Sequence, residues 1–183
     1  MNKLITTIAC LICCIVYTQA QNKDNMLSKK EQSIAAISMY AARGNQDSLK
    51  VILARGLDCG LTVSEEKEVL TQLYAYCGFP RSMGALVTLM NLTKERAAQG
   101  IKDEAGREPS PVKSSDMFVV GGQNQLKLFG RPALGEVLTF APALDQFLKA
   151  HLFGDIFSRD NLDWRTRCLL YTSPSPRDRS VSR

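Results

Sequence analysis

The fold of this chain is decided by the stretch Glu66-Lys-Glu-Val-Leu-Thr-Gln-Leu-Tyr-Ala-Tyr-Cys-Gly-Phe-Pro-Arg81. Apolar residues recur in it three and four positions apart, which is typical of an amphipathic helix. Gly78 breaks the helical run, and Pro80 suits the first turn of a following helix because its φ angle is already helical. The stretch therefore predicts two helices that meet at a tight corner, with two acids, two phenols, one thiol and one guanidinium near the bend.

The residues before this stretch predict two further helices. Ser28-Lys-Lys-Glu31 has the spacing of a capping box, and the helix that it starts is expected to end at Gly44. A second helix follows, capped by Asp47 or Ser48 and closed by Gly60. Both segments carry apolar residues at helical spacing, so each is expected to bury one face.

The deciding stretch itself supplies the third and fourth helices. Thr62 or Ser64 caps the third helix, and Glu65-Glu66 in its first turn suits the positive end of the helix dipole. We expect both of these glutamates to be solvated. The fourth helix is expected to run from the corner to Gly100. No segment of this region alternates as a strand would, so the predicted fold class is all-α.

The following segment, 101–141, is interpreted as a linker and irregular region. Its first part is polar and contains two prolines, and Gly121-Gly122, Gly130 and Pro132 favour loops or short irregular pieces over 118–138. Another helix is expected over 142–157. Its inward residues are predicted to be Leu144, Phe147, Leu148, Leu152 and Phe153.

The N-terminal residues 1–20 have the pattern of a secretory signal peptide. Lys3 supplies a positive start, an apolar run covers 4–17, and Thr18-Gln-Ala20 precedes a cleavage point at Gln21. The apolar run is short for a membrane span, and a membrane anchor is the alternative interpretation. The pattern therefore predicts a secreted or periplasmic protein with no stable membrane span after cleavage.

The C-terminal residues 168–183 are rich in Ser, Pro and Arg and have no apolar period, so they cannot bury a face. Two interpretations stay open: translated adapter or vector sequence, or a natural disordered tail. Just before this tail, Leu162-Asp163-Trp-Arg-Thr-Arg167 has the character of 27–32, with a leucine, a cap residue and a charged first turn. We therefore interpret 142–167 as a helix that leads into a second repeat, which breaks off near Arg167.

The charge and the single histidine limit the classes of partner. The formal net charge is +5, of which the tail and Lys3 carry +3, so the rest of the chain carries only +2. This ordinary surface gives no electrostatic reason to expect nucleic acid. One histidine and scattered acids give no pattern of metal ligands, and we expect no cofactor.

The cysteines are expected to be free thiols. Of the six, three lie in the predicted signal peptide and Cys168 lies at the start of the tail, which leaves Cys59 and Cys77. If these two flank one helix, about 15 residues at ~1.5 Å each hold them about 20 Å apart. A disulfide needs Cα atoms within about 7 Å, so the two cysteines cannot pair unless another subunit supplies a partner.

Residues 27 to about 90 resemble the carboxymuconolactone decarboxylase-like family. The resemblance is carried by Leu27-Ser28 with Glu31, by residues 56–62, by Glu68-Val-Leu with Gln72, and above all by Tyr76-Cys-Gly-Phe-Pro-Arg81. It implies an alkylhydroperoxidase D-like helical bundle over 21–100 that assembles as trimers or hexamers and acts on a small molecule. Residues 142–167 are also similar to the stretch between domains in secreted two-copy members.

The family includes lactone decarboxylases and alkylhydroperoxidase D-like peroxidases, and this chain departs from both. The peroxidases rely on a Cys-x-x-Cys pair with a nearby histidine, whereas Cys77 is followed by Gly-Phe-Pro80. The decarboxylases typically have a histidine on the second helix, at a position that falls near Ile52. The single histidine, His151, lies outside the resembling region and is interpreted as a surface residue. The resemblance thus implies a peroxiredoxin-type or a lactone-decarboxylase-like activity, and a non-catalytic exported module for assembly or ligand binding is the alternative.

Five residues near the corner are candidate site residues. Cys77 is a peroxidatic thiol if Arg81 or the next helix lowers its pKa, and otherwise a small buried hydrophobe. Glu68 is a general base if burial raises its pKa, a partner of Arg81, or an acid that only stabilises the helix start. Arg81 suits the binding of a substrate carboxylate or a structural ion pair. Tyr74 and Tyr76 either orient a carboxylate substrate or pack at a subunit interface.

Overall fold

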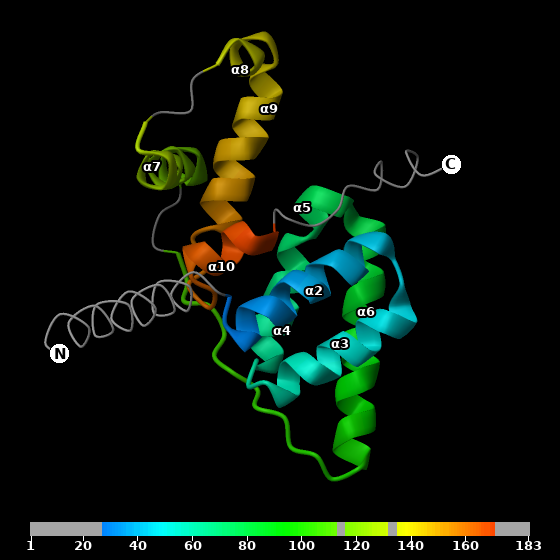
Figure 1. Ribbon diagram of the computed structural model, residues 1–183. Coiled ribbons are helices and arrows are strands. Elements are labelled where there is room, and N and C mark those ends of the chain that lie inside the picture. Colours follow the sequence, from blue (N-terminus) through cyan, green and yellow to red (C-terminus); the bar gives the residue numbers. More distant parts are fainter. Residues whose placement is uncertain (1–26, 113–115, 132–134, 171–183) are drawn as a thin grey trace, which may run out of the picture.

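The computed structural model describes residues 27–112, 116–131 and 135–170, and every regular element in these ranges is a helix (Figure 1). This confirms the predicted all-α fold. None of the described helices is long and apolar enough to span a bilayer. The predicted signal peptide and nearly all of the predicted tail lie outside the described ranges.

Five helices form a bundle that holds the first hydrophobic core. They are α2 (Lys29–Arg43), α3 (Gln46–Asp58), α4 (Val63–Gln72), the short α5 (Tyr74–Cys77) and α6 (Phe79–Ala98). Most leucines and isoleucines of these helices are fully or almost fully buried in this core. The core side chains include Ile37, Leu49, Leu53, Val69, Leu70, Leu73, Ala85 and Leu89.

The helix caps agree with the sequence except in one helix. Ser28 starts α2 with a complete capping box, as predicted. Thr62, one of the two predicted caps of the third helix, starts α4, and it also forms a capping box. The second helix is capped by Asn45, whose side-chain oxygen accepts from Ser48 N–H at 3.1 Å, so the prediction of Asp47 or Ser48 as cap is wrong. Gly44 takes a left-handed conformation directly before Asn45, with φ of 69°, and this starts the helix earlier.

The predicted corner joins α4 to α6. The chain passes through Leu73 into the single turn of α5, and Gly78 follows with φ of 81°, a conformation that L residues with a side chain rarely adopt. α6 then begins at Phe79 with Pro80 in its first turn. The apolar side chains Phe79, Met83, Val87 and Met90 of α6 are exposed. They form a stripe of the kind that subunit contacts cover, and assembly into an oligomer stays a prediction.

The segment 101–112 is irregular, as predicted, but it is bound to the bundle. Val63 N–H donates to the Glu104 carbonyl and Ser64 N–H donates to the Ala105 carbonyl, both at 2.9 Å. These bonds occupy amide groups of the first turn of α4 that have no partner within the helix. The segment therefore runs as a strap across the start of α4 and fixes the exit from α6.

A helix occupies much of 118–138, for which loops or short irregular pieces were expected. α7 (Met117–Phe129) passes through Gly121-Gly122 and ends at Gly130, which has φ of 69°. Gly121 lies against the backbone at Lys149 and Gly154, where any added Cβ would collide. The glycine is therefore needed for close approach of two helices and does not break α7.

α7 pairs with a helical run that confirms the helix predicted over 142–157. The run follows α8 (Glu136–Phe140) and consists of α9 (Pro142–Gln146) and the π-helix η1 (Phe147–Ile156). The inward prediction is right for Leu148, Leu152 and Phe153 but wrong for Leu144 and Phe147, which are exposed. Phe147 begins η1, where the wider i→i+5 turns shift the buried face away from the α-helical pattern, and Leu144 lies in α9, ahead of that stretch.

The last described helix, α10 (Trp164–Leu169), connects the two parts of the molecule. It begins at the predicted cap Asp163 and contacts α2, and Leu162 and Leu170 on either side of it join the first core. In Figure 1 it lies between the α2–α6 bundle and the α7–η1 pair, which projects away from the bundle. That this segment opens a second repeat stays a prediction; here it packs on the first bundle.

Candidate functional site: a buried carboxylate held by two arginines

Glu68 is at the centre of the most highly connected polar cluster in the described structure. It lies on the buried face of α4, and its side chain is almost completely inaccessible to solvent. Arg159 Nε donates to both carboxylate oxygens, at 2.8 and 3.0 Å, and Arg167 Nη2 donates to Oε1 at 2.9 Å. Asn161 Nδ2 donates to Oε2 at 3.1 Å. The partners of Glu68 are therefore Arg159 and Arg167, in place of the predicted Arg81.

These hydrogen bonds keep Glu68 ionised. Burial alone raises the pKa of the carboxyl, but the bonds from Arg159 and Arg167 favour the charged form more strongly and the net pKa lies below its usual range. A carboxylate stabilised in this way is a weak base. The raised pKa that general-base duty requires is therefore absent from Glu68 in this arrangement.

A chain of hydrogen bonds links Glu68 to Tyr76 at the corner. Arg167 Nη1 donates to Gln72 Oε1 at 2.8 Å, and Gln72 Nε2 donates to the Tyr76 hydroxyl oxygen at 2.9 Å. Glu68, Gln72 and Tyr76 are spaced four residues apart, so they share one side of the α4–α5 run. This spacing is the reason that the residues of the predicted corner meet the arginine from α10.

The cluster carries more positive than negative charge. One carboxylate faces two guanidinium groups, of which Arg167 is 0% exposed and Arg159 is 38% exposed. Arg159 contacts Glu68 through Nε alone, and its two Nη groups have no hydrogen-bond partner among the residues that the structure describes. The outer edge of Arg159 can therefore accept an anion with the paired N–H geometry that carboxylates fit.

Cys77 lies at the corner and does not have the features of an activated thiol. Its Sγ donates to the Leu73 carbonyl at 3.1 Å. Burial raises its pKa, and the nearby charge of Arg81 only partly offsets this effect. Within the described residues Cys59, Cys77 and Cys168 form no disulfide, so Cys59 and Cys77 do not pair with each other. Since the thiolate is the reactive form, this geometry favours packing over nucleophilic chemistry at Cys77.

The two candidate tyrosines have different surroundings. Tyr76 belongs to the hydrogen-bond chain, whereas the ring of Tyr74 stacks on Phe79 with centroids 4.5 Å apart. The Tyr74 ring also lies 5.5 Å from His151, which is half exposed and bonds to Asp155 at 2.7 Å. The structure therefore brings together Glu68 and Tyr76 but places Tyr74 in an aromatic contact beside the corner.

Several residues of the cluster could not be identified from the sequence. Arg159, Asn161 and Arg167 lie more than ninety residues from Glu68 and outside the resembling segment. The only signal was the density of polar residues around 158–167.

Glu66 was expected to be solvated, but it is fully buried without a hydrogen-bond partner in the described ranges, and burial raises its pKa to about 9.

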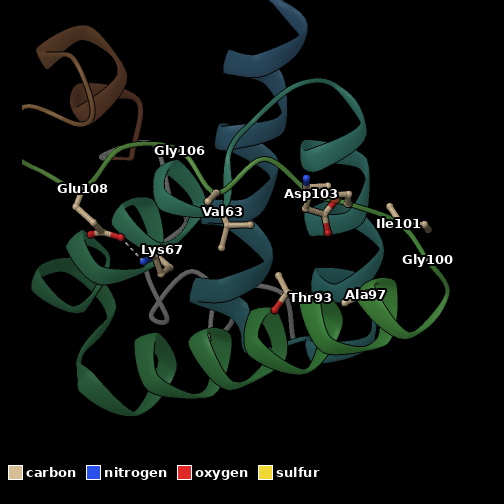
Figure 2. Close-up of a pocket in the computed structure, with 11 residues that line it drawn as sticks. Val63, Lys67, Thr93, Ala97, Gly100, Ile101, Asp103, Gly106 and Glu108 are labelled. Carbon is tan, nitrogen blue, oxygen red and sulfur yellow. Dashed lines mark hydrogen bonds and ion pairs between the residues drawn. The ribbon is translucent and has the colours of Figure 1, made fainter.

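A wider hollow of about 520 Å³ lies under the strap, between α4 and α6. Figure 2 shows Lys67 and Glu108 pointing toward each other at one end, and these exposed side chains form an ion pair of 2.6 Å. None of the predicted site residues lines it. The described residues also contain no group of three or more His, Cys, Asp or Glu side chains that could hold a metal ion. The hollow therefore offers no cluster with evident chemistry.

A comparison with known protein families matches the part of the chain that contains the corner. The sequence profile of the Carboxymuconolactone decarboxylase family matches residues 16–89. No curated protein sequence matches the chain. The matched segment contains Glu68, Gln72 and Tyr76, whereas the residues that complete the cluster from α10 and the preceding loop lie beyond it.

Proposed function

We propose that this chain acts on a small carboxylate-bearing molecule, as a lactone-decarboxylase-like catalyst. The match of residues 16–89 to the carboxymuconolactone decarboxylase family supports this proposal. The observation that carries the proposal is the pair of guanidinium groups on Glu68, with the outer edge of Arg159 partly exposed. Arg159 is the proposed contact for the substrate carboxylate.

The charge of the cluster suits this class of reaction. Loss of carbon dioxide from an unsaturated lactone acid breaks a C–C bond and leaves the electron pair, and with it negative charge, on the remaining ring, which then takes a proton from water. A fixed excess of positive charge beside the substrate stabilises that charge as it develops, without reorganisation at the moment of reaction. Glu68 is ionised by the same arginines, so its proposed role is to hold their guanidinium groups in place and not to transfer a proton.

Thiol-dependent peroxidase activity is the second candidate, and one observation favours it. The charge of Arg81 acts on the Cys77 thiol and lowers its pKa against the larger effect of burial. A peroxidatic role would require a change that exposes the thiol or moves Arg81 closer. Peroxide consumption by the purified protein that disappears in Cys77→Ser would support this candidate, and equal consumption in that variant would exclude the thiol mechanism.

The decarboxylase proposal is tested by carbon dioxide release from a small unsaturated lactone acid. We expect Arg159→Gln to lower kcat/KM by about 10- to 100-fold, since one charge-assisted contact to the substrate is lost. Arg159→Lys should recover only part of the rate because lysine lacks the paired N–H geometry.

The matched control is Arg165→Gln. Arg165 also bonds to a carboxylate, that of Glu31 at 2.9 Å, but it is 68% exposed and lies outside the cluster. It should leave the rate unchanged. Equal rates in the Arg159 and Arg165 variants would exclude the proposed substrate contact. Absence of both carbon dioxide release and peroxide consumption in the parent chain would favour the non-catalytic module.

A further inference from the structure

A second cavity, separate from the Glu68 cluster, lies between α7 and η1. It has a volume of about 420 Å³, which is within the range of small-molecule pockets. Its walls include Phe129 of α7, Leu152 and Phe153 of η1, and Phe157, which follows η1. Neither Glu68 nor any of its hydrogen-bond partners lines it, so it is independent of the proposed function.

One polar side chain in the wall has unused hydrogen-bonding groups. Gln125 is 1% exposed, and neither its Oε1 nor its Nε2 has a hydrogen-bond partner within the described residues. The preceding residue shows how an amide is usually accommodated here. Asn124 Nδ2 donates to the Phe153 carbonyl at 2.7 Å and to Ser158 Oγ at 3.1 Å. Buried polar groups are rarely left unpaired, so Gln125 requires a reason of its own.

The rest of the wall is uncharged and consists of three phenylalanines, three leucines and Cys168. The rings of Phe129 and Phe153 meet edge to face with centroids 5.8 Å apart, and Phe153 and Phe157 are 5.0 Å apart. No lysine, arginine, aspartate or glutamate is among the described lining residues. An ion would enter this cavity without a counter-charge, and this excludes charged ligands on energetic grounds. A flat neutral ring can pack against the phenylalanines.

We propose that this cavity binds a neutral aromatic carboxamide. The ring packs among the phenylalanines, and the Gln125 amide, which is shielded in the structure without ligand, turns toward the cavity. The amide N–H of the ligand then donates to Gln125 Oε1, and the ligand carbonyl accepts from Gln125 Nε2. Such a ligand supplies both partners that Gln125 lacks, whereas a hydrocarbon of the same shape supplies neither. The ligand's preference for this site therefore comes from the single amide of Gln125.

The test compares three probes of similar shape on the full-length chain by ligand-observed NMR: benzamide, benzoate and toluene. We expect benzamide to bind at least about tenfold more tightly than toluene, which leaves the amide unpaired, and than benzoate, which is charged at pH 7. Toluene binding as tightly as benzamide, or no measurable binding of benzamide, would overturn the proposal.

Two variants locate the preference. Gln125→Met keeps the length of the side chain and removes its donor and acceptor, so the preference for benzamide over toluene should disappear. Gln123→Met is the matched control, because Gln123 is exposed on the same helix and should leave the preference intact. Retention of the preference in Gln125→Met would contradict the assigned contact. Because this readout is binding alone, failure of the proposed catalytic function leaves it unaffected.

Discussion

The α2–α6 bundle and the α7–η1 pair each bury one glutamine, with opposite outcomes. Gln72 in the bundle is 0% exposed, donates to Tyr76 and to the Arg167 carbonyl, and accepts from the Arg167 guanidinium. Gln125 on α7 is 1% exposed and has no partner within the described structure. Burial of the same side chain therefore contributes to a network in one region and leaves unsatisfied groups in the other.

The difference comes from α10. This helix brings Arg167 into the bundle, where its guanidinium completes the hydrogen bonds of both Glu68 and Gln72. The α7–η1 pair is joined mainly by phenylalanine and leucine side chains, which cannot hydrogen-bond to an amide. A buried polar group can thus fix the position of a distant helix, as in the bundle, or provide a place for a ligand, as we propose for the cavity.

The largest effect is expected from removing the arginine that completes the bundle network. Arg167→Met removes the hydrogen bonds that Arg167 donates to Glu68 and to Gln72 Oε1. We therefore expect a loss of about 3–5 kcal/mol in the free energy of unfolding. Urea unfolding measures this loss.

The control for this prediction lies on the same helix. Arg165→Met removes an exposed ion pair with Glu31 and should cost less than about 1 kcal/mol. If the Arg167 and Arg165 variants unfold at the same urea concentration, the network does not hold α10 on the bundle, and the contrast between the two glutamines loses its explanation.

Glu66 is the exception within the bundle, and it gives the second largest expected effect. Burial, with a smaller contribution from Asp103, raises its pKa to about 9, so it is protonated at neutral pH in the folded state. The unfolded chain releases this proton near the ordinary value of 4.5. Between these two values the folded state holds the extra proton, so stability must fall as pH rises.

We expect this fall to be about 1 kcal/mol per pH unit between about pH 5.5 and 7.5. Glu66→Gln cannot ionise and should remove the slope while keeping the side-chain volume. The measurement is urea unfolding of the parent and of Glu66→Gln at both pH values. Equal slopes in the two proteins would show that Glu66 is ionised in the folded state, with a partner or water that stabilises its charge.

Local patterns in the sequence were sufficient to predict the bundle. Ser28 and Thr62 begin helices because their side chains cap amide groups only three residues away, a distance that sequence spacing specifies. The same holds for the corner, where Gly78 takes a positive φ and Pro80 enters the next helix. Each of these features depends on neighbouring residues, and each could be identified without knowledge of the tertiary structure.

The site and the α7–η1 pair depend on contacts between distant residues. Glu68 meets Arg159 across 91 residues, a separation for which helical spacing carries no information. Glu66 is buried as well because α4 is covered on a second side, where Glu66 packs against Gly56 of α3. Glycine usually destabilises a helix, and the close approach of η1 to α7 explains why Gly121 nevertheless lies within one. These interactions could not be predicted from local spacing alone.

The smallest expected effect tests the two glutamines directly. Gln72→Met removes hydrogen bonds to Tyr76 and Arg167 and leaves the Arg167 N–H unpaired, so it should cost about 1–3 kcal/mol of unfolding free energy. Gln125→Met removes no hydrogen bond within the described structure and relieves an unsatisfied amide. It should therefore be neutral or stabilise the chain by about 1 kcal/mol. Urea unfolding of both variants without ligand decides the comparison: equal destabilisation would mean that Gln125 has partners in solution, and the cavity would then offer an already satisfied amide to any ligand.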